Sequence, residues 1–299
     1  DVGAQSASFM FDAHVLELWP LLYSGTCCVI APKDSTKDLE SFSALLAETK
    51  CSWTFFVPSV LAEILRNFTL PPSVKTVVVG GEATSLQLCS NILEQNVRLI
   101  NMYGPTEAAV ASTFLQISSL ADVPAGCTSL PIGRPCPWRR CWVLDTYRQP
   151  SMSFTGELYI SGEGLSSGYL GLPEKTSEVF LPNPFLPIDG SAKMYKSGDL
   201  VRFISDGHLE FLGRLDYQVK LRGLRIELGE IENVMRHVEH VSEALVMVKR
   251  EQLVGYFSGT AGEATVLNAC KAALPGYMVP ATVIHLRAWP RGRTGKIDR

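Results

Sequence analysis

The first hundred residues alternate between amphipathic segments and short β-rich segments. Apolar side chains recur at helical spacing in four stretches, 11–23, 39–48, 60–67 and 86–94. Between them lie four runs of strand-forming residues, 26–30, 53–57, 76–79 and 97–101. This βαβ rhythm predicts the α/β class, a largely parallel sheet core with helices on both faces. Because such sheets bind ligands at the carboxyl ends of their strands, we expect a site in the loops after Val79 and Asn101.

The pattern changes after Pro131 to short strands separated by glycine and proline, at 157–160, 200–204 and 209–211. It predicts a smaller β-rich subdomain. Beyond Gly213, a strand at 217–221, a helix at 229–237 and strands at 244–248 and 252–257 indicate a small α+β C-terminal domain. We therefore expect three parts: an α/β subdomain over 1–130, a β-rich subdomain over 131–215 and a mobile α+β tail over 216–299.

Composition and charge narrow the class of protein. The 299 residues are 46% hydrophobic and 19% charged, with a net charge of −3 and basic residues spread along the chain. This distribution lacks the basic patch typical of nucleic-acid or anionic-membrane partners, so neither is expected. The apolar runs are too short to cross a bilayer and the N-terminus does not resemble a signal peptide. We expect a soluble, cytoplasmic protein.

Cysteines and histidines give no sign of a metal or nucleophilic site. The eight cysteines include no CxxC pair and no histidines at zinc spacing, so we interpret them as reduced thiols, mostly in the core. A clip between Cys136 and Cys141 is the less favoured alternative. The glycines between Gly156 and Gly168 do not follow the GxGxxG spacing before a helix, and we interpret them as turn residues.

Seven motifs carry a family resemblance, and they are spread in order over almost the whole chain. They are Phe11–Ala13, Asn101–Glu107, Gly156–Leu170, Tyr195–Leu200, Gly213–Glu232, Leu274–Pro280 and Gly295–Arg299. Together they resemble the signature motifs of adenylation domains of nonribosomal peptide synthetases, within the superfamily of acyl-CoA ligases and luciferases. The run from Arg225 to Glu232 is similar to the peptide-synthetase version rather than the acyl-CoA ligase version.

The resemblance implies an ATP- and Mg²⁺-dependent ligase that activates an amino acid as aminoacyl-AMP, with release of pyrophosphate. The product would pass to the phosphopantetheine thiol of a peptidyl carrier domain, beside a condensation domain. The family's glycine-rich phosphate loop should precede Phe11, so we expect this chain to lack it and not to turn over by itself. Two alternatives stay open: an acyl-CoA or aryl-acid ligase of the same superfamily, and a non-catalytic truncated remnant.

The resemblance also assigns roles around the nucleotide. Asn101 would contact the adenine edge, Tyr103 would stack on the ring, Thr106 would touch phosphate and Glu107 would hold Mg²⁺. A carboxylate holding a hard cation is the usual partner of phosphate, although the same residues could form only a turn with a cap. Gly81 would let the backbone approach the adenine, or it could simply serve a turn.

Ribose contacts are assigned to the second half of the chain. By resemblance Asp199 accepts hydrogen bonds from both ribose hydroxyls; on its own, an aspartate following Gly198 could form an Asx-turn. Arg214 would reach the ribose or the phosphate. Phe211 stands where some relatives have tyrosine, so a contact from a phenol hydroxyl is missing and we expect weaker nucleotide affinity.

Two positions are implied in the reaction and in domain movement. Lys296 matches the family lysine that bridges the substrate carboxylate and the α-phosphate, where the transition state gathers negative charge. Asp216 matches the family's hinge. Rotation there would withdraw Lys296 and bring the loop around Gly223 to the site for the second half-reaction.

Asp12 matches the aspartate that pairs with the substrate's α-ammonium, although a helix N-cap is its plain alternative. Positions carried over from the family's substrate pocket are Asp12, Ala13, Leu16, Phe56, Val78, Gly80, Met102, Val110, Ala111 and Lys296. Everything between the two charged ends is apolar, and a pocket without hydrogen-bonding groups disfavours polar side chains. We therefore expect a neutral, hydrophobic amino acid.

Overall fold

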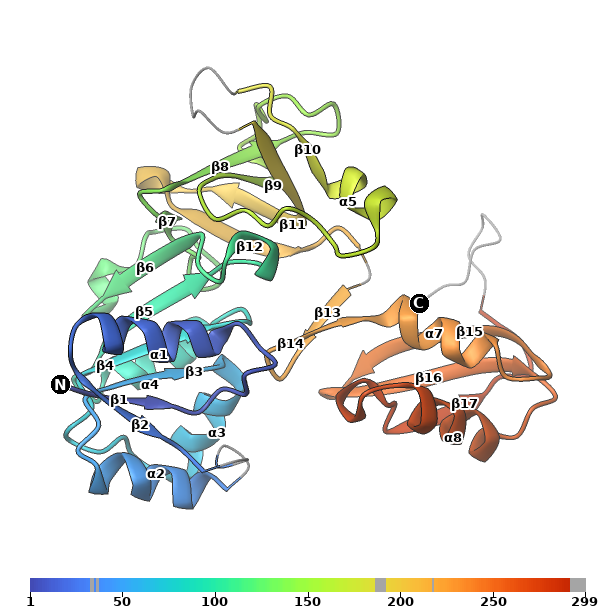
Figure 1. The fold of residues 1–299 in the computed structure, drawn as a ribbon, viewed down its shortest axis with the longest axis horizontal. Coiled ribbons are helices and arrows are strands. Elements are labelled where there is room, and N and C mark those ends of the chain that lie inside the picture. Colours follow the sequence, from blue (N-terminus) through green and yellow to red (C-terminus); the bar gives the residue numbers. More distant parts are fainter. Residues whose placement is uncertain (33–34, 36–37, 186–191, 217, 291–299) are drawn as a thin grey trace. The chain divides into compact units, whose positions relative to one another are not determined.

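The computed structural model describes residues 1–32, 35, 38–185, 192–216 and 218–290 (Figure 1). The chain divides into two compact units, Asp1–Leu215 and Asp216–Arg299. The first unit contains two sheets and the second unit contains a hairpin and a small sheet.

A seven-stranded sheet with the order β2-β1-β3-β4-β5-β6-β7 organises the first half of the first unit. Neighbours from β2 to β5 are parallel, whereas β6 and β7 are antiparallel additions. The elements are β1 (Val2–Gln5), α1 (Ala13–Tyr23), β2 (Cys27–Ile30), α2 (Leu39–Glu48), β3 (Trp53–Phe56), α3 (Pro58–Asn67), β4 (Thr76–Gly80), α4 (Leu86–Leu93), β5 (Arg98–Tyr103), β6 (Thr113–Ile117) and β7 (Arg134–Pro135).

Helices cover both faces of this sheet. On one face α2, α3 and α4 pack on alternate strand residues such as Val77, Val79 and Leu99, all fully buried. On the other face lies α1, which Figure 1 shows across the sheet from α2 and α3. It approaches β1 so closely that a Cβ at Gly3 would lie 2.4 Å from a methyl carbon of Leu21. A side chain at this position would displace Leu21, so glycine permits the close helix–strand packing.

Local signals explain where the helices begin. The Asp38 carboxylate accepts from the backbone N–H of Ser41 at the start of α2, and the Ser85 hydroxyl accepts from Leu88 at the start of α4. Pro58 occupies the first turn of α3, where its missing N–H is not needed.

A second, antiparallel sheet follows, with the order β10-β11-β9-β8 and β12 paired to β11. Its elements are β8 (Arg139–Leu144), β9 (Thr155–Gly162), α5 (Pro173–Val179), β10 (Phe180–Pro182), β11 (Lys193–Phe203) and β12 (Leu209–Arg214). One buried cluster contains Tyr103 and Ala108 together with Leu158 and Val201, so the two sheets share a core. Short 3-10 turns in this unit are η2 (Thr106–Ala108), η3 (Leu120–Asp122) and η4 (Ser205–Gly207).

The second unit has its own core around the buried side chains of Ile231, Val246, Phe257 and Val266. A hairpin turns through Arg222 and Gly223, both at positive φ (51° and 74°). The elements are β13 (Gln218–Leu221), β14 (Leu224–Glu227), α7 (Leu228–Arg236), β15 (Val241–Lys249), β16 (Gln252–Gly259), α8 (Glu263–Ala273), η5 (Gly276–Met278) and β17 (Thr282–His285).

The predicted fold class is confirmed: a mainly parallel sheet with helices on both faces, a β-rich sheet and an α+β tail. Elements that were not named from the sequence include β1, β6, α5, β14, α8 and β17. The β1 segment Val-Gly-Ala-Gln is too short and too poor in β-branched residues to show alternation, although pairing with β2 and β3 makes it a strand. All eight cysteines are free, and Cys51, Cys89, Cys136 and Cys270 are buried.

Among the described residues, no helix has the length and apolar character that crossing a bilayer requires.

Candidate functional site

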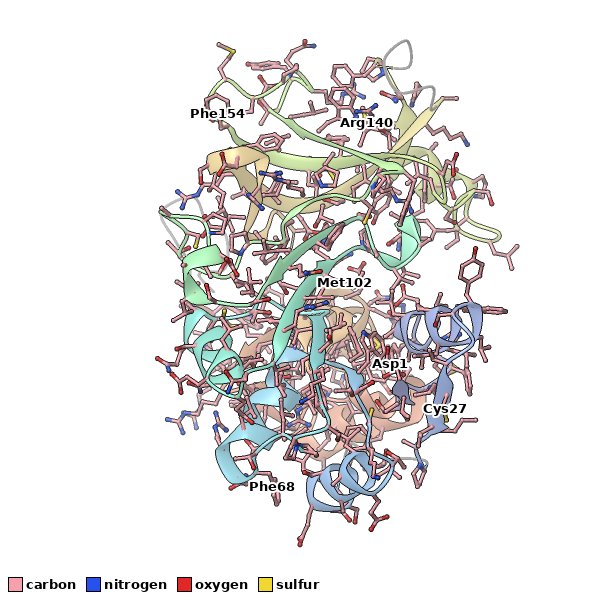
Figure 2. The ribbon with its side chains drawn as sticks, turned by 90° about the vertical axis from the view of Figure 1, so that its left-hand side faces the viewer. Asp1, Cys27, Phe68, Met102, Arg140 and Phe154 are labelled. Atoms are coloured by element: carbon pink, nitrogen blue, oxygen red, sulfur yellow. The ribbon has the colours of Figure 1, made fainter. Side chains whose placement is uncertain are left out.

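The strand order identifies the carboxyl ends of β1 and β3 as the place where a ligand site is expected. The chain leaves β1 toward β2 on one side and leaves β3 toward β4 on the other, which is the topological switch point where open α/β sheets bind ligands. Asp12 lies after β1 at the start of α1, while Gly80 and Met102 pair at the ends of β4 and β5. In Figure 2 Met102 lies between Phe68, at the end of α3, and Phe154 of the β-rich part.

Three of the predicted nucleotide-binding residues meet in one hydrogen-bonded cluster. The Tyr103 hydroxyl donates to Oδ2 of Asp199 at 2.5 Å, and the Arg214 guanidinium donates to Oδ1 at 2.9 Å. Arg214 also donates to the carbonyl of Ser197 at 2.8 Å. Asp199 is 2% exposed, so this ion pair lies in a poorly solvated environment. Burial, the Asp199 charge and their hydrogen bond raise the pKa of Tyr103, so its hydroxyl remains a donor.

Asp199 is in the middle of β11, so the plain alternative of an Asx-turn is not realised. The register of β11 against β9 shifts between Lys196 and Leu200, where Gly198 has a φ of 73°. The Ser197 hydroxyl donates to the carbonyl of Leu158 at 2.6 Å and accepts from the Asp199 N–H at 3.0 Å. A β-bulge thus turns the Asp199 side chain toward β5, which a turn interpretation of Ser-Gly-Asp could not reveal.

Asn101 is 3% exposed and its amide is engaged within the protein. Its Nδ2 donates to the carbonyl of Pro131 at 2.8 Å, and its Oδ1 accepts from the Thr84 hydroxyl at 3.1 Å. The side chain therefore links β5 to the segment that enters the β-rich part, and the adenine contact stays a prediction.

Gly81 follows β4 with a φ of +87° and is exposed, so the turn requires glycine whatever else approaches it.

The turn after β5 is strained. A Cβ at Gly104 would lie 2.2 Å from the carbonyl oxygen of Val110, so no other residue fits there. Ala109 and Val110 both have positive φ (50° and 69°), which is unfavourable above all for a β-branched residue. Such strain persists only where surrounding contacts impose it, and it is common at functional sites. Within this turn Thr106 is exposed.

Glu107 is held by the loop after β9. The Tyr169 hydroxyl donates to its Oε1 at 2.6 Å, and the Ser166 N–H donates to its carbonyl at 2.8 Å. Across the described part of the chain, no group of three or more His, Cys, Asp or Glu side chains could hold a metal ion. Mg²⁺ usually takes one or two carboxylates together with substrate phosphates, so a single Glu107 fits that ion.

The substrate-pocket positions divide between the two faces of the sheet. Val78, Gly80 and Met102 share the α1 face, since Gly80 pairs with Met102 and alternates with Val79. A Cβ at Gly80 would lie 2.9 Å from the Met102 carbonyl and 3.4 Å from Cε2 of Phe55.

The placement of Phe56 in the pocket is corrected by this alternation. Phe56 pairs with Val79, and its ring packs edge-on against Phe42 in the core beneath the sheet, with ring centroids 5.9 Å apart. Its neighbour Phe55 faces the pocket side instead. Motif spacing could not distinguish two adjacent phenylalanines, because a shift of one residue reverses the face of a strand.

Asp12 occupies the N-cap position of α1, but its side chain makes no capping hydrogen bond. Ala13 and Leu16 follow on the same helix and are half-buried, and Ala111 is 8% exposed. The capping interpretation of Asp12 is therefore not realised, and the ammonium-binding role stays a prediction.

Glu17 is a buried residue that the sequence analysis missed. It is fully buried in α1, and Oε2 accepts from the backbone N–H groups of Ser6 (2.9 Å) and Ala7 (2.7 Å) while Oε1 accepts from the Ser6 hydroxyl (2.9 Å). Burial raises the pKa of Glu17, although these hydrogen bonds oppose the shift. The carboxylate anchors the loop that leads to Asp12. A glutamate four residues before buried Leu21, on the inward face of the helix, was the available sign.

The remaining predicted residues lie at or beyond the end of the first unit. Phe211 is half-buried and packs on the cluster around Tyr103. Asp216 is exposed at the boundary between the units, and its Oδ1 accepts from the Gln218 N–H at 3.1 Å. Lys296 lies outside the described residues, so its role stays a prediction.

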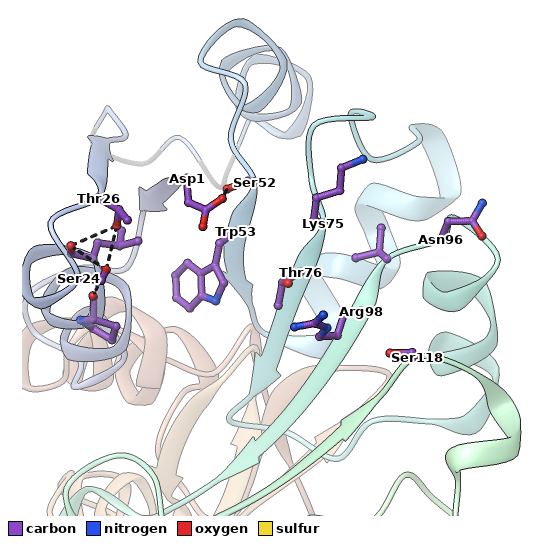
Figure 3. Close-up of a pocket in the computed structure, with 13 residues that line it drawn as sticks. Asp1, Ser24, Thr26, Ser52, Trp53, Lys75, Thr76, Asn96, Arg98 and Ser118 are labelled. Atoms are coloured by element: carbon purple, nitrogen blue, oxygen red, sulfur yellow. Dashed lines mark hydrogen bonds between the residues drawn. The ribbon is translucent and has the colours of Figure 1, made fainter.

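A cavity of about 670 Å³ lies at the opposite, amino-terminal edge of the sheet (Figure 3). Trp53, Thr76 and Arg98, which begin β3, β4 and β5, line it together with Lys75. Since open α/β sheets bind ligands at the carboxyl ends of their strands, this cavity is not the candidate site.

Comparison with known proteins identifies the family. The model of the AMP-binding enzyme family matches residues 1–170. Tyrocidine synthase 2 of Brevibacillus parabrevis is 38% identical over 312 residues, covering 100% of this chain and 8% of that protein. Malpinin synthetase of Mortierella alpina is 40% identical over 315 residues, covering 99% of this chain and 4% of that protein.

A solved structure extends the comparison to the fold. PA1221, described as an NRPS protein containing adenylation and PCP domains, superposes with a TM-score of 0.84 at 25% identity. The match covers 99% of this chain and 52% of that one. The chain thus spans a small share of the synthetases it matches and about half of this solved chain. It belongs to the AMP-binding enzyme family and, within it, to the adenylation domains of nonribosomal peptide synthetases.

Proposed function

We propose that this chain takes part in ATP-dependent activation of a neutral, hydrophobic amino acid as aminoacyl-AMP, and in its transfer to a carrier domain. One observation carries the proposal. Tyr103, Asp199 and Arg214 form a buried polar cluster that adjoins the turn of Glu107, while Phe55, Gly80 and Met102 present an apolar face at the same sheet edge. A nucleotide and an apolar amino acid could thus bind side by side.

The nucleotide would bind across the two sheets. The Asp199 carboxylate is suited to accept from ribose hydroxyls, because Tyr103 and Arg214 already hold both of its oxygens in a fixed orientation. Ribose binding would share or replace one of those donors. Thr106 would lie toward the phosphates and the exposed Gly81 toward the base.

In the first half-reaction a carboxylate oxygen of the amino acid attacks the α-phosphorus of ATP. The new C–O–P bond forms as the bond between the α-phosphorus and the bridging oxygen breaks, and pyrophosphate leaves with that electron pair. Mg²⁺ would neutralise charge on the phosphate oxygens, and Glu107 would hold it. Lys296 would donate to the attacking carboxylate and the α-phosphate, while Asp12 would pair with the α-ammonium group.

In the second half-reaction the phosphopantetheine thiol of a peptidyl carrier domain attacks the acyl carbon, and AMP leaves. The sulfur therefore comes from the partner. Asp216 begins the second unit, and a rotation there would exchange Lys296 for the β13–β14 hairpin. Carrier and condensation domains are thus the proposed partners. The eight free cysteines fit a reducing, cytoplasmic compartment.

The substrate class follows from the apolar side chains at the sheet edge. Phe55, Val78 and Met102 offer no side-chain hydrogen-bonding group, so a polar substrate side chain would lose its water contacts without replacement. Asp12 favours an amino acid over a plain carboxylic acid, because its carboxylate would form an ion pair with the α-ammonium group that only the amino acid carries.

ATP–pyrophosphate exchange tests the proposal, with the chain expressed in its full-length protein and offered each amino acid in turn. We expect exchange with one or a few hydrophobic amino acids, and formation of the corresponding acyl-AMP. Exchange driven instead by an aryl or fatty acid would indicate an acyl- or aryl-acid ligase. A folded protein that binds ATP but exchanges with no acid would reject the proposal and leave a non-catalytic nucleotide-binding module.

A further inference from the structure

The loop between β9 and α5 forms two hydrogen bonds to Glu107, in the turn after β5. The Tyr169 hydroxyl donates to Oε1 of Glu107 at 2.6 Å, and the Ser166 N–H donates to the Glu107 carbonyl at 2.8 Å. These contacts reach the same residue through its side chain and its backbone, from positions about sixty residues away in the chain. The loop therefore fixes both the position and the rotation of Glu107.

A buried arginine ties the same loop to the same turn. Arg139 is 3% exposed, and its guanidinium donates to the carbonyls of Ala108 and Glu163. Ala108 is next to Glu107 in the turn, and Glu163 is the first residue of the loop after β9. Arg139 thus holds the turn and the loop at a fixed separation, so the Tyr169 hydroxyl meets the carboxylate in one geometry.

The Tyr169 side chain is itself held rigidly. Its backbone N–H donates to the Thr176 hydroxyl at 2.9 Å, its ring packs edge-on against Phe180 with centroids 6.0 Å apart, and Lys175 Nζ lies 5.5 Å from the ring centroid. A ring packed on two sides leaves the hydroxyl little freedom. Tyr169 is therefore a preorganised donor rather than a mobile surface phenol.

One hydrogen bond changes what a carboxylate can do for a metal ion. A carboxylate has about four lone-pair sites, so a single donor fixes its rotation without exhausting its capacity to accept. Mg²⁺ demands near-octahedral geometry with oxygens at about 2.0–2.1 Å, so a misrotated carboxylate binds it poorly. Hydrogen bonds to a ligating carboxylate typically contribute roughly 10–100-fold in metal affinity.

We propose that Tyr169 is the positioning residue that orients the Glu107 carboxylate for the divalent cation that accompanies ATP. The inference rests on the proposed function, since it takes Glu107 as the residue that holds Mg²⁺. It goes further by assigning a role to a residue of the β9–α5 loop, whose glycines otherwise indicate only turns. Tyr169 touches neither the nucleotide nor the metal in this role and acts through Glu107.

Tyr169→Phe in the full-length protein tests the role, because it removes the hydroxyl and keeps the ring. ATP affinity is measured by calorimetry in EDTA and over a Mg²⁺ series, and Mn²⁺ binding to the ATP complex is measured by electron paramagnetic resonance. We expect metal-free ATP affinity to stay near wild type while the Mg²⁺ concentration for half-maximal effect rises about tenfold. A change in loop stability alone would move neither measurement selectively.

Tyr159→Phe is the matched control, because it removes a phenol hydroxyl that donates to Glu157 at 3.2 Å. It should leave the Mg²⁺ dependence unchanged. If Tyr169→Phe does not fold, Thr176→Val removes the hydroxyl that anchors the Tyr169 backbone and should raise the Mg²⁺ requirement less steeply. An unchanged requirement in whichever of these two variants folds overturns the inference.

Glu107→Gln separates this inference from the proposed function. If Glu107→Gln raises the Mg²⁺ requirement and Tyr169→Phe does not, the positioning role is wrong and the proposed function stands. If Glu107→Gln has no effect on Mg²⁺ dependence, Glu107 is not the metal ligand and both the metal assignment and the role of Tyr169 fail.

Discussion

The hydroxyl of Tyr103 donates a hydrogen bond to Oδ2 of Asp199 at 2.5 Å, although the two residues lie 96 positions apart in the chain. The bond joins the last residue of β5 to the middle of β11, so it couples the parallel sheet to the β-rich sheet. Arg214 completes the arrangement from β12. The residues expected at the base and at the ribose are thus parts of one hydrogen-bonded unit.

Tyr103→Phe should lower the stability of the first unit by about 1.5–3 kcal/mol, because a buried carboxylate loses a donor. Chemical denaturation followed by tryptophan fluorescence measures this loss. Tyr23→Phe is the control, since Tyr23 is 96% exposed and its change should be within about 0.5 kcal/mol.

The Tyr103→Phe variant keeps the ring that would stack on adenine, so the KM for ATP should rise much less than in Tyr103→Ala. Equal KM values for Phe and Ala variants would contradict the stacking role.

Glu17 should make stability fall as pH rises above 4.5, its ordinary pKa. Burial raises its pKa in the folded state, so the folded protein holds a proton that the unfolded chain has already released. The free energy of unfolding therefore decreases with rising pH from 4.5 to the folded-state pKa and then levels off.

Glu17→Gln should remove this pH-dependent contribution, and denaturation midpoints between about pH 4 and pH 8 measure it. The amide has one acceptor oxygen where the carboxylate has two, so the Ser6–Ala7 loop should loosen and the KM for the amino acid should rise more than the KM for ATP. Glu63→Gln is the control, because the Glu63 side chain is 47% exposed in a surface ion pair with Arg66. This variant should leave the dependence of stability on pH unchanged. A wild-type slope in Glu17→Gln would contradict the assignment.

Phe55→Ala and Phe56→Ala should separate substrate choice from core packing. Phe55 lies beside Gly80 on the pocket face, so its truncation should enlarge the pocket and shift pyrophosphate exchange toward larger amino acids. Phe56 packs on Phe42 in the core, so its truncation should cost about 3–5 kcal/mol of stability and leave the substrate preference unchanged. The reverse pattern would restore Phe56 to the pocket.

These two phenylalanines show what the sequence could and could not specify. The βαβ alternation predicted β3 and β4 because buried strands are continuous apolar runs. Which of two adjacent aromatic residues faces a ligand depends on strand register, and register is set by pairing across the sheet. Asp199 illustrates the same limit, since a glycine-containing motif typical of a turn is held as a bulged strand by pairing with β9.

Buried polar groups are the second feature that could not be predicted from the sequence. Arg139 resembles an ordinary charged residue in the sequence, because its hydrogen-bond partners lie 24 and 31 positions away. The sign for Glu17 was its place on the inward face of α1, and the acceptor role of its carboxylate appears only in the structure. The motif residues Tyr103, Asp199 and Arg214 were identified because their types and order resemble a family, and the structure adds that they bind one another. Roles that need a bound nucleotide or the tail lysine remain predictions.

Lys296→Ala and Asp216→Pro should affect different half-reactions. Removing the Lys296 ammonium takes away positive charge from the developing phosphate transition state, so pyrophosphate exchange should fall about 10²–10³-fold while amino-acid binding is retained. Proline at 216 fixes φ at the boundary between the units and should slow transfer to the carrier thiol, with exchange close to wild type. Single-turnover loading of the carrier domain and equilibrium exchange, measured on the same preparations, distinguish the two. Wild-type exchange in Lys296→Ala would remove the lysine from the reaction, and wild-type loading in Asp216→Pro would show that rotation at this boundary is not needed for the second step.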